Sequence, residues 1–202
     1  MHSREKQMRD RITKKGRGWC FTPNAFLDMA GKDAIWVTLS RLVQKGMIRR
    51  LARGVYDYPV QHPRIGLVAP DPDAVAKALA SRDAIRLQPS GAYAANLLGL
   101  SDQVPAKVVF LTDGPARRVK IGGREIILRS TTPRNMATAD RISGTVIQAL
   151  RFMGQQQIND THVRHLAELM QQEDKAQLLK DRVYAPGWMH PIINAIAGGE
   201  DA

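Results

Sequence analysis

The sequence contains a single cysteine, Cys20, among 202 residues. One cysteine excludes an intramolecular disulfide and a zinc site built on cysteine pairs, and it is typical of a reducing compartment. Apolar runs such as Val108–Leu111 are far shorter than the roughly 20 residues that a membrane-spanning helix needs. Residues 1–6 are charged and lead into no apolar segment, so we expect no signal peptide. These features predict a cytoplasmic protein with no membrane partner.

Acidic side chains are also few: 19 Asp and Glu stand against 30 Lys and Arg, which gives a net charge of +11 and a pI near 10.2. The excess is uneven, because residues 1–60 hold 13 basic and 5 acidic side chains, net +8, and the remainder holds 17 and 14, net +3. Apolar residues make up 44%, an ordinary globular value. Such asymmetry is typical of a nucleic-acid-binding module joined to a less basic body.

Residues 1–60 have the pattern of a winged helix-turn-helix domain. Good helix formers precede Gly16, Thr22–Pro23 is a helix-start signal, and Asp33 is placed to cap a longer helix. Two β-prone runs then flank a glycine-containing turn, which predicts a hairpin. The expected elements are helices over residues 3–15, 23–29 and 33–45, a short strand at 19–21, and hairpin strands at 47–51 and 55–58.

The third expected helix has a buried and an exposed face. Ile35, Leu39 and Leu42 share one stripe, with Val43 beside it, and Trp36 falls at its boundary, where we expect partial burial. Small, polar and cationic side chains on the opposite face suit a major groove, and arginines on the hairpin suit phosphates. The predicted DNA-binding residues are Lys14, Lys15, Arg17, Val37, Thr38, Ser40, Arg41, Gln44, Lys45, Arg49, Arg50 and Arg53.

The rest of the chain predicts a linker and a second domain. Residues 61–72 are rich in proline and lack periodicity, as a linker does. Residues 73–202 mix helix and strand patterns, so the whole chain is expected to be α+β. The middle of this domain is expected to be a small antiparallel meander, followed by several helices from residue 137. Its three strands are expected at 107–112, 117–121 and 124–129, with Gly122–Gly123 as a hairpin turn.

No set of residues in the sequence satisfies the requirements of an enzyme site, and we expect no catalytic residue, metal or cofactor. His162 and His165 share a helix face but lack the further ligands of a zinc motif. An enzyme with scattered residues such as Asp113, Arg124 and Glu125 is an alternative: a nuclease or a nucleotidyl-modifying protein. Cys20, between two aromatic residues, is expected to be buried rather than reactive.

Two stretches of the sequence resemble the AbiEi family of bacterial type IV toxin–antitoxin antitoxins. They are Leu39–Tyr56 and Pro89–Ser101, and the similarity continues through Gln103–Lys107 and Leu111–Gly114. The resemblance implies a winged helix that binds inverted repeats in double-stranded DNA at its own promoter and represses the operon. It also implies that the second domain counters a nucleotidyltransferase-like toxin, without requiring a stable complex.

Two further alternatives stay open. A stand-alone regulator without a toxin partner would have the same residues, and a winged helix can also serve as a protein-interaction module. Half-sites about one helical turn apart in the DNA would imply two protomers on one operator.

Overall fold

The structure is a computed structural model, and it describes residues 4–198. Helices and strands are mixed throughout, so the predicted α+β class is confirmed. The chain divides into two compact units. The first holds the described residues up to Ile85 together with Val119–Gly123, and the second holds Arg86–Arg118 and the described residues from Arg124 onward.

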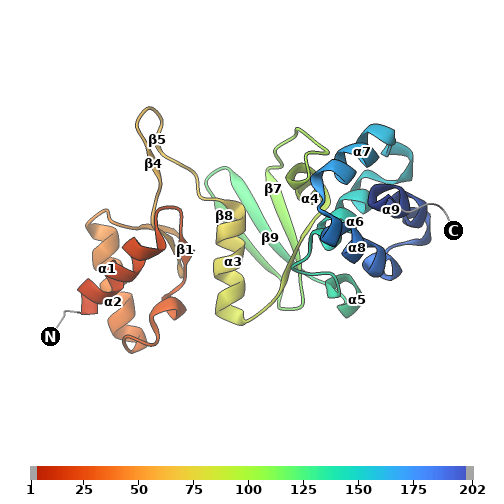
Figure 1. Cartoon of the computed structure of the whole chain (residues 1–202). Helices are drawn as coiled ribbons and strands as arrows, with labels where there is room; N and C mark the ends of the chain where they lie inside the picture. Colours follow the sequence, from red (N-terminus) through yellow and green to blue (C-terminus); the bar gives the residue numbers. More distant parts are fainter. Residues whose placement is uncertain (1–3, 199–202) are drawn as a thin grey trace. The chain divides into compact units, whose positions relative to one another are not determined.

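In its described residues, the first unit combines three long helices with a small antiparallel sheet (Figure 1). Its elements are α1 (Arg4–Lys15), β1 (Cys20–Phe21), the 3₁₀ helix η1 (Pro23–Phe26), α2 (Lys32–Gln44), β2 (Arg49–Ala52), β3 (Val55–Asp57), β4 (Gln61–His62), β5 (Gly66–Leu67) and α3 (Pro72–Asp83). The three-stranded sheet has the order β1-β3-β2, and β4 pairs with β5 as a separate hairpin.

Burial in this unit follows the sequence periodicity closely. Met8 and Ile12 of α1 and Ile35 and Leu39 of α2 are fully buried, as their spacing predicts. These side chains pack with Phe21, Phe26 and Tyr56 from the sheet and η1 into one core. The buried stripe therefore fixes which face of α2 points outward.

Several local predictions need correction. The second helix, expected over 23–29, is a 3₁₀ turn of four residues. The helix after it begins at Lys32 with Gly31 as its N-cap, so Asp33 lies in the first turn and caps nothing. Part of the expected linker is the hairpin β4–β5. The boundary expected at residue 73 also differs, because α3 belongs to the first unit, where it packs against β1 and β3.

The second unit is a four-stranded sheet with helices gathered on one side (Figure 1). Its elements are β6 (Leu87–Ser90), α4 (Gly91–Leu97), β7 (Lys107–Thr112), β8 (Arg117–Ile121), β9 (Arg124–Ser130), α5 (Pro133–Met136), α6 (Ile142–Met153), η2 (Gln155–Gln157), α7 (Asp160–Leu169), α8 (Gln172–Asp181), η3 (Arg182–Tyr184), η4 (Gly187–Met189) and α9 (His190–Ala197). The last three residues of β8 belong to the first unit. The core contains Val146 and Leu150 of α6, Leu166 of α7 and Ile193 of α9.

The strand order differs from the predicted meander. The sheet runs β6-β7-β9-β8, and β7 pairs with β9 in parallel, with Lys107 opposite Glu125 and Thr112 opposite Ser130. The short connection after β7 carries the chain two strand positions, about 10 Å, to the edge. After the Gly122–Gly123 turn, β9 lies between β7 and β8. Apolar alternation predicts strands but does not determine which two become neighbours.

Candidate nucleic-acid interface

The outward face of α2 presents four of the side chains that are predicted to read bases. Ser40, Arg41 and Gln44 are exposed, and Val37 is 50% exposed. These four lie opposite the buried stripe, on consecutive turns of one helix. An exposed helix face of small, amide and guanidinium groups has the donors and acceptors that base edges in a major groove require.

Thr38 does not belong to this face. Its side chain is buried, and its hydroxyl donates to the Ala34 carbonyl oxygen one turn earlier, at 2.8 Å. A threonine that bonds to its own helix in this way has no donor to offer to a base. The structure therefore separates Thr38 from the other four predicted base readers.

The hairpin β2–β3 exposes two of the three predicted arginines, Arg53 in its turn and Arg50 on β2. Ala52 pairs with Val55, so the turn consists of Arg53 and Gly54 alone, and Gly54 has a φ of +74°. Arg50 and Arg53 are exposed. Both guanidinium groups are therefore available to an anionic partner.

Arg49 is different, because it serves the fold. Its Nε and Nη2 donate to the Asp57 carboxylate at 3.1 and 2.6 Å, and Nη2 also donates to the Val68 carbonyl at 3.0 Å. Asp57 is almost completely buried, and its hydrogen bonds raise the pKa of the Arg49 guanidinium. The geometry thus gives Arg49 a structural partner instead of a phosphate.

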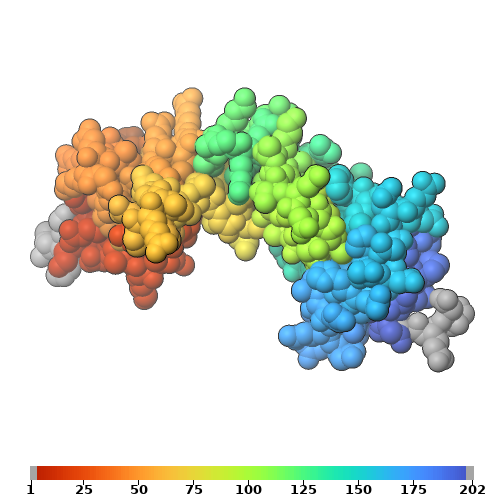
Figure 2. Space-filling view, turned by 90° about the horizontal axis from the view of Figure 1, so that it is seen from above, coloured from red at the N-terminus to blue at the C-terminus, as the bar shows by residue number. Residues whose placement is uncertain are grey.

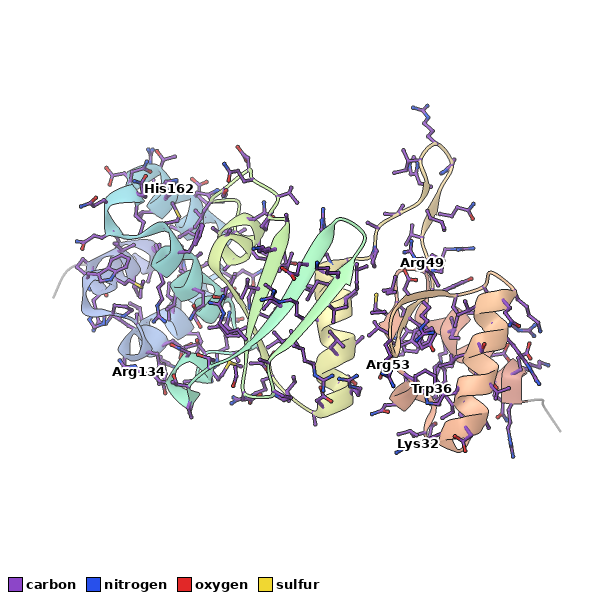
Figure 3. All side chains as sticks on the ribbon, turned by 180° about the vertical axis from the view of Figure 1, so that it is seen from behind. Lys32, Trp36, Arg49, Arg53, Arg134 and His162 are labelled. Atoms are coloured by element: carbon purple, nitrogen blue, oxygen red, sulfur yellow. The ribbon has the colours of Figure 1, made fainter. Side chains whose placement is uncertain are left out.

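Two side chains near the hairpin were not predicted as site residues. Trp36 is 42% exposed, more than its boundary position suggests, and its ring meets Tyr56 edge-on with centroids 6.4 Å apart. With Lys32 it lines a hollow of about 230 Å³ beside Gly54. In Figure 3, Lys32, Trp36 and Arg53 lie on one side of the unit. The sequence signal was Lys32 and Trp36 one turn apart, next to the exposed face.

Three further predicted cations gather at and just after the end of α1. Lys14 and Lys15 are exposed and line an open hollow of about 590 Å³ with Trp19, and the Lys15 ammonium lies 6.0 Å from the Trp19 ring centroid. Arg17 donates to the Pro59 carbonyl at 2.8 Å and lies 4.9 Å from the Tyr58 ring centroid. Arg17 thus retains exposed N–H groups while it holds the segment after β3.

Ion pairs inside the unit engage most of its few acids. Lys45 pairs with Glu5 and lowers the pKa of that carboxyl, and Arg11 pairs with Asp28 at 2.6 Å and lowers its pKa in the same way. Asp57 is held by Arg49. Lys45 is therefore less available than predicted, whereas Arg41, Arg50 and Arg53 form no ion pair with an acidic side chain of the described residues.

The alternative catalytic set is not brought together by the fold. Asp113 follows the end of β7, whereas Glu125 lies opposite Lys107 at its start, so six residues of strand, about 20 Å, separate them. Asp113 accepts from the Arg86 backbone and side chain at 2.9 and 2.8 Å, which lowers the pKa of its carboxyl. Glu125 pairs with Arg118 at 3.5 Å.

The other candidate groups also have roles in the fold. His162 and Asn159 form a capping box at the start of α7, and His165 Nε2 lies 2.8 Å from the Leu98 carbonyl oxygen. No group of three or more His, Cys, Asp or Glu within residues 4–198 is arranged to hold a metal ion. Cys20 is buried, as predicted, and burial together with Asp57 and Asp71 raises its pKa to about 12. The absence of an enzyme activity stays a prediction.

The fold and this surface define a class: an α+β protein whose N-terminal unit joins an exposed polar helix face to a basic hairpin. The chain belongs to DUF6088, a family of unknown function, which it matches over residues 7–178. The match begins in α1 and ends in α8, so it includes most of both units. No curated protein matches the sequence. Across the described part of the chain, no helix is both long and apolar enough to cross a membrane. The similarity to the AbiEi family stays a prediction.

Proposed function

We propose that this protein is a sequence-specific binder of double-stranded DNA that represses its own operon in the cytoplasm. The observation that carries the proposal is the outward face of α2, where Val37, Ser40, Arg41 and Gln44 stand exposed on a helix held by a fully buried stripe. The order of helix, strand, helical turn, helix and hairpin supports a winged-helix arrangement, with α2 as the recognition helix and β2–β3 as the wing.

Two kinds of contact follow from this arrangement. Arg41 and Gln44 carry donors that read base edges in the major groove, where arginine pairs well with guanine and glutamine with adenine. Arg50 and Arg53 reach phosphates from the hairpin and contribute binding energy without sequence preference.

The proposal extends to an antitoxin role against a nucleotidyltransferase-like toxin. This part is supported only by the resemblance of Leu39–Tyr56 and Pro89–Ser101 to the AbiEi family. Its direct test is co-expression of the chain with the product of a neighbouring gene, scored by growth.

The first experiment titrates the full chain against its own upstream duplex and a scrambled duplex at two salt concentrations. We expect a preference of about a thousandfold or more, typical of specific regulators, with a steep salt dependence. Weak and equal binding to both duplexes would contradict the proposal.

Two substitutions separate the roles of helix and hairpin. Arg41→Ala should cost about 1–3 kcal/mol on the upstream duplex and relax specificity at one base pair. Arg53→Ala should weaken binding to all duplexes alike and reduce the salt slope by about one unit. If Arg41→Ala lowers affinity equally for specific and scrambled DNA, Arg41 does not read bases.

Exposed apolar groups on α2 favour a second candidate, a protein-interaction module. Trp36 and Val37 are 42% and 50% exposed and lie next to each other on the helix. In that case the exposed face of α2 docks a protein, and the affinity for that partner depends little on salt. The titration distinguishes the two candidates, because a docking module gives no specific shift of the upstream duplex.

A further inference from the structure

In the described residues, β4 and β5 form a two-stranded sheet of their own. His62 pairs with Gly66 and Gln61 with Leu67, so Pro63, Arg64 and Ile65 form the turn. We call residues 58–70 the arm. It stands away from the rest of its unit in Figure 1, and in Figure 2 it faces the viewer in gold. A two-stranded hairpin of this kind is marginal in water unless something holds it.

The base of the arm is held firmly. The Val68 amide donates to the Val60 carbonyl at 2.9 Å, and the Gly18 amide donates to the Tyr58 carbonyl at 2.6 Å. Arg49 binds the Val68 carbonyl, and Arg17 binds the Pro59 carbonyl. Two arginines and a backbone ladder therefore fix the direction in which the arm leaves the core.

The tip of the arm, by contrast, is uncovered. Ile65 is 72% exposed, the highest value among the exposed large hydrophobic side chains of the described chain, and Leu67 is 57% exposed. Arg64 beside Ile65 is exposed as well. From residue 58 to residue 70 the sequence has no acidic side chain. An apolar side chain and a cation thus share an acid-free tip on the more basic part of the protein.

We propose that the arm enters the minor groove of the bound duplex, with Arg64 in the groove and Ile65 wedged between base pairs. The inference rests on the proposed DNA binding and adds the groove and a deformation of the DNA. The minor groove is about 6 Å wide, too narrow for two strands with their side chains. Entry therefore requires the groove to open, and an inserted apolar side chain opens it by unstacking a base step and bending the duplex.

Each part of the tip has a physical role in this arrangement. The Arg64 guanidinium is attracted by the negative potential of the groove, which is strongest where A·T pairs narrow it. The Ile65 side chain leaves water for the space between base pairs, and the anchored base keeps the arm from folding away. DNA is favoured over a protein surface as the occupant because its charge complements the acid-free arm.

The test measures bending and affinity together. The full chain is titrated with its upstream duplex carrying a fluorescent donor and acceptor at the two ends. Energy transfer rises when wild-type protein bends the duplex. Ile65→Ala should abolish this rise and weaken binding about tenfold, because the wedge is lost. Arg64→Ala should weaken binding about tenfold and remove the preference for A·T pairs under the arm.

Controls separate the arm from general effects. Val183→Ala removes another exposed apolar side chain, 63% exposed and in the second unit, and should leave bend and affinity unchanged. Replacing the A·T pairs under the arm by inosine·cytosine keeps the minor-groove pattern and alters the major groove. Affinity for that duplex should stay within about twofold if the arm reads the minor groove.

The outcomes distinguish the two proposals. If wild-type protein binds no duplex specifically, the proposed function fails and the arm proposal falls with it. If wild-type protein binds specifically but Ile65→Ala bends and binds the duplex as well as wild type, only the arm proposal is overturned. If Ile65→Ala abolishes self-association of the protein and leaves DNA binding intact, the tip binds a second copy of the chain. That outcome would also overturn the arm proposal.

Discussion

Gly144, in the first turn of α6, is the most closely packed glycine of the second unit. A Cβ at this position would overlap with the Thr138 carbonyl oxygen and the Gln88 side-chain amide, and would lie 2.8 Å from Thr138 Oγ1. Gln88 is fully buried; with its side-chain nitrogen turned toward Thr138 it donates to the Thr138 carbonyl at 3.0 Å, and its side-chain oxygen accepts from the Thr145 amide at 3.0 Å. The obstacle is therefore a backbone atom and a fixed amide, neither of which moves without breaking these bonds.

Gly144→Ala should consequently destabilise the second unit by about 3 kcal/mol or more, at the upper end of the range for overpacking. The measurement is urea unfolding followed by circular dichroism. Gly187→Ala is the matched control, because no atom lies within 4 Å of its added Cβ and its backbone is not left-handed. The control should change stability by less than about 0.5 kcal/mol. Equal midpoints for the two variants would contradict this packing.

At the scale of elements, the hairpin β2–β3 combines a structural and a surface arginine at adjacent positions. Arg49→Met removes the charge that neutralises buried Asp57 and releases the Val68 carbonyl at the base of the arm. We expect a loss of about 2–4 kcal/mol, below the full cost for a completely buried pair because Arg49 is 28% exposed.

The neighbouring substitution Arg50→Met provides the control, since the Arg50 side chain is exposed. It should leave stability within about 0.5 kcal/mol of wild type and weaken binding to every duplex alike. Thermal unfolding and DNA titration of both variants check the pair. A stable Arg49→Met protein with weakened DNA binding would return Arg49 to the phosphate-binding set.

The elements that sequence reasoning predicted well are those whose signal is local. The spacing of Met8 and Ile12, and of Ile35 and Leu39, placed α1 and α2 and identified their buried faces, because helix burial repeats with the helix period. Asp71 caps α3 through a local contact of the same kind, with its side chain accepting from the Asp73 amide at 3.1 Å. The exposure of Arg41 and Gln44 is predicted by the helix period, and that of Arg53 by the glycine-containing turn.

The structure departs from the sequence predictions where distant residues decide. The sequence predicts Arg49 at phosphates because nothing local indicates its pairing with Asp57 across the hairpin and with Val68 beyond it. The sequence predicts a linker over residues 61–72 because Pro63 and Gly66 break periodicity, yet Pro63 lies in the tight turn of a hairpin and Gly66 pairs with His62 in it. The place of β9 between β7 and β8 is likewise a tertiary choice.

At the scale of the whole molecule, the two units have separate hydrophobic cores. Met8, Phe26 and Leu39 belong to one, and Leu150, Leu166 and Ile193 belong to the other. A unit with its own core can unfold separately, with its own free energy of unfolding. A substitution in one core can therefore destabilise its own unit more than the other. A single unfolding free energy is then not a property of the chain.

Tryptophan fluorescence tests this directly, because Trp19 packs against the first core and Trp188 against the second. With Trp188→Phe as background the signal reports the first unit, and with Trp19→Phe and Trp36→Phe it reports the second. Gly144→Ala should lower the urea midpoint of the Trp188 signal by about 1 M or more and shift the Trp19 signal little, given typical urea dependence. Arg49→Met should lower the urea midpoint of the Trp19 signal and shift the Trp188 signal little. Equal shifts of both signals for either variant would mean that the two cores unfold as one cooperative structure.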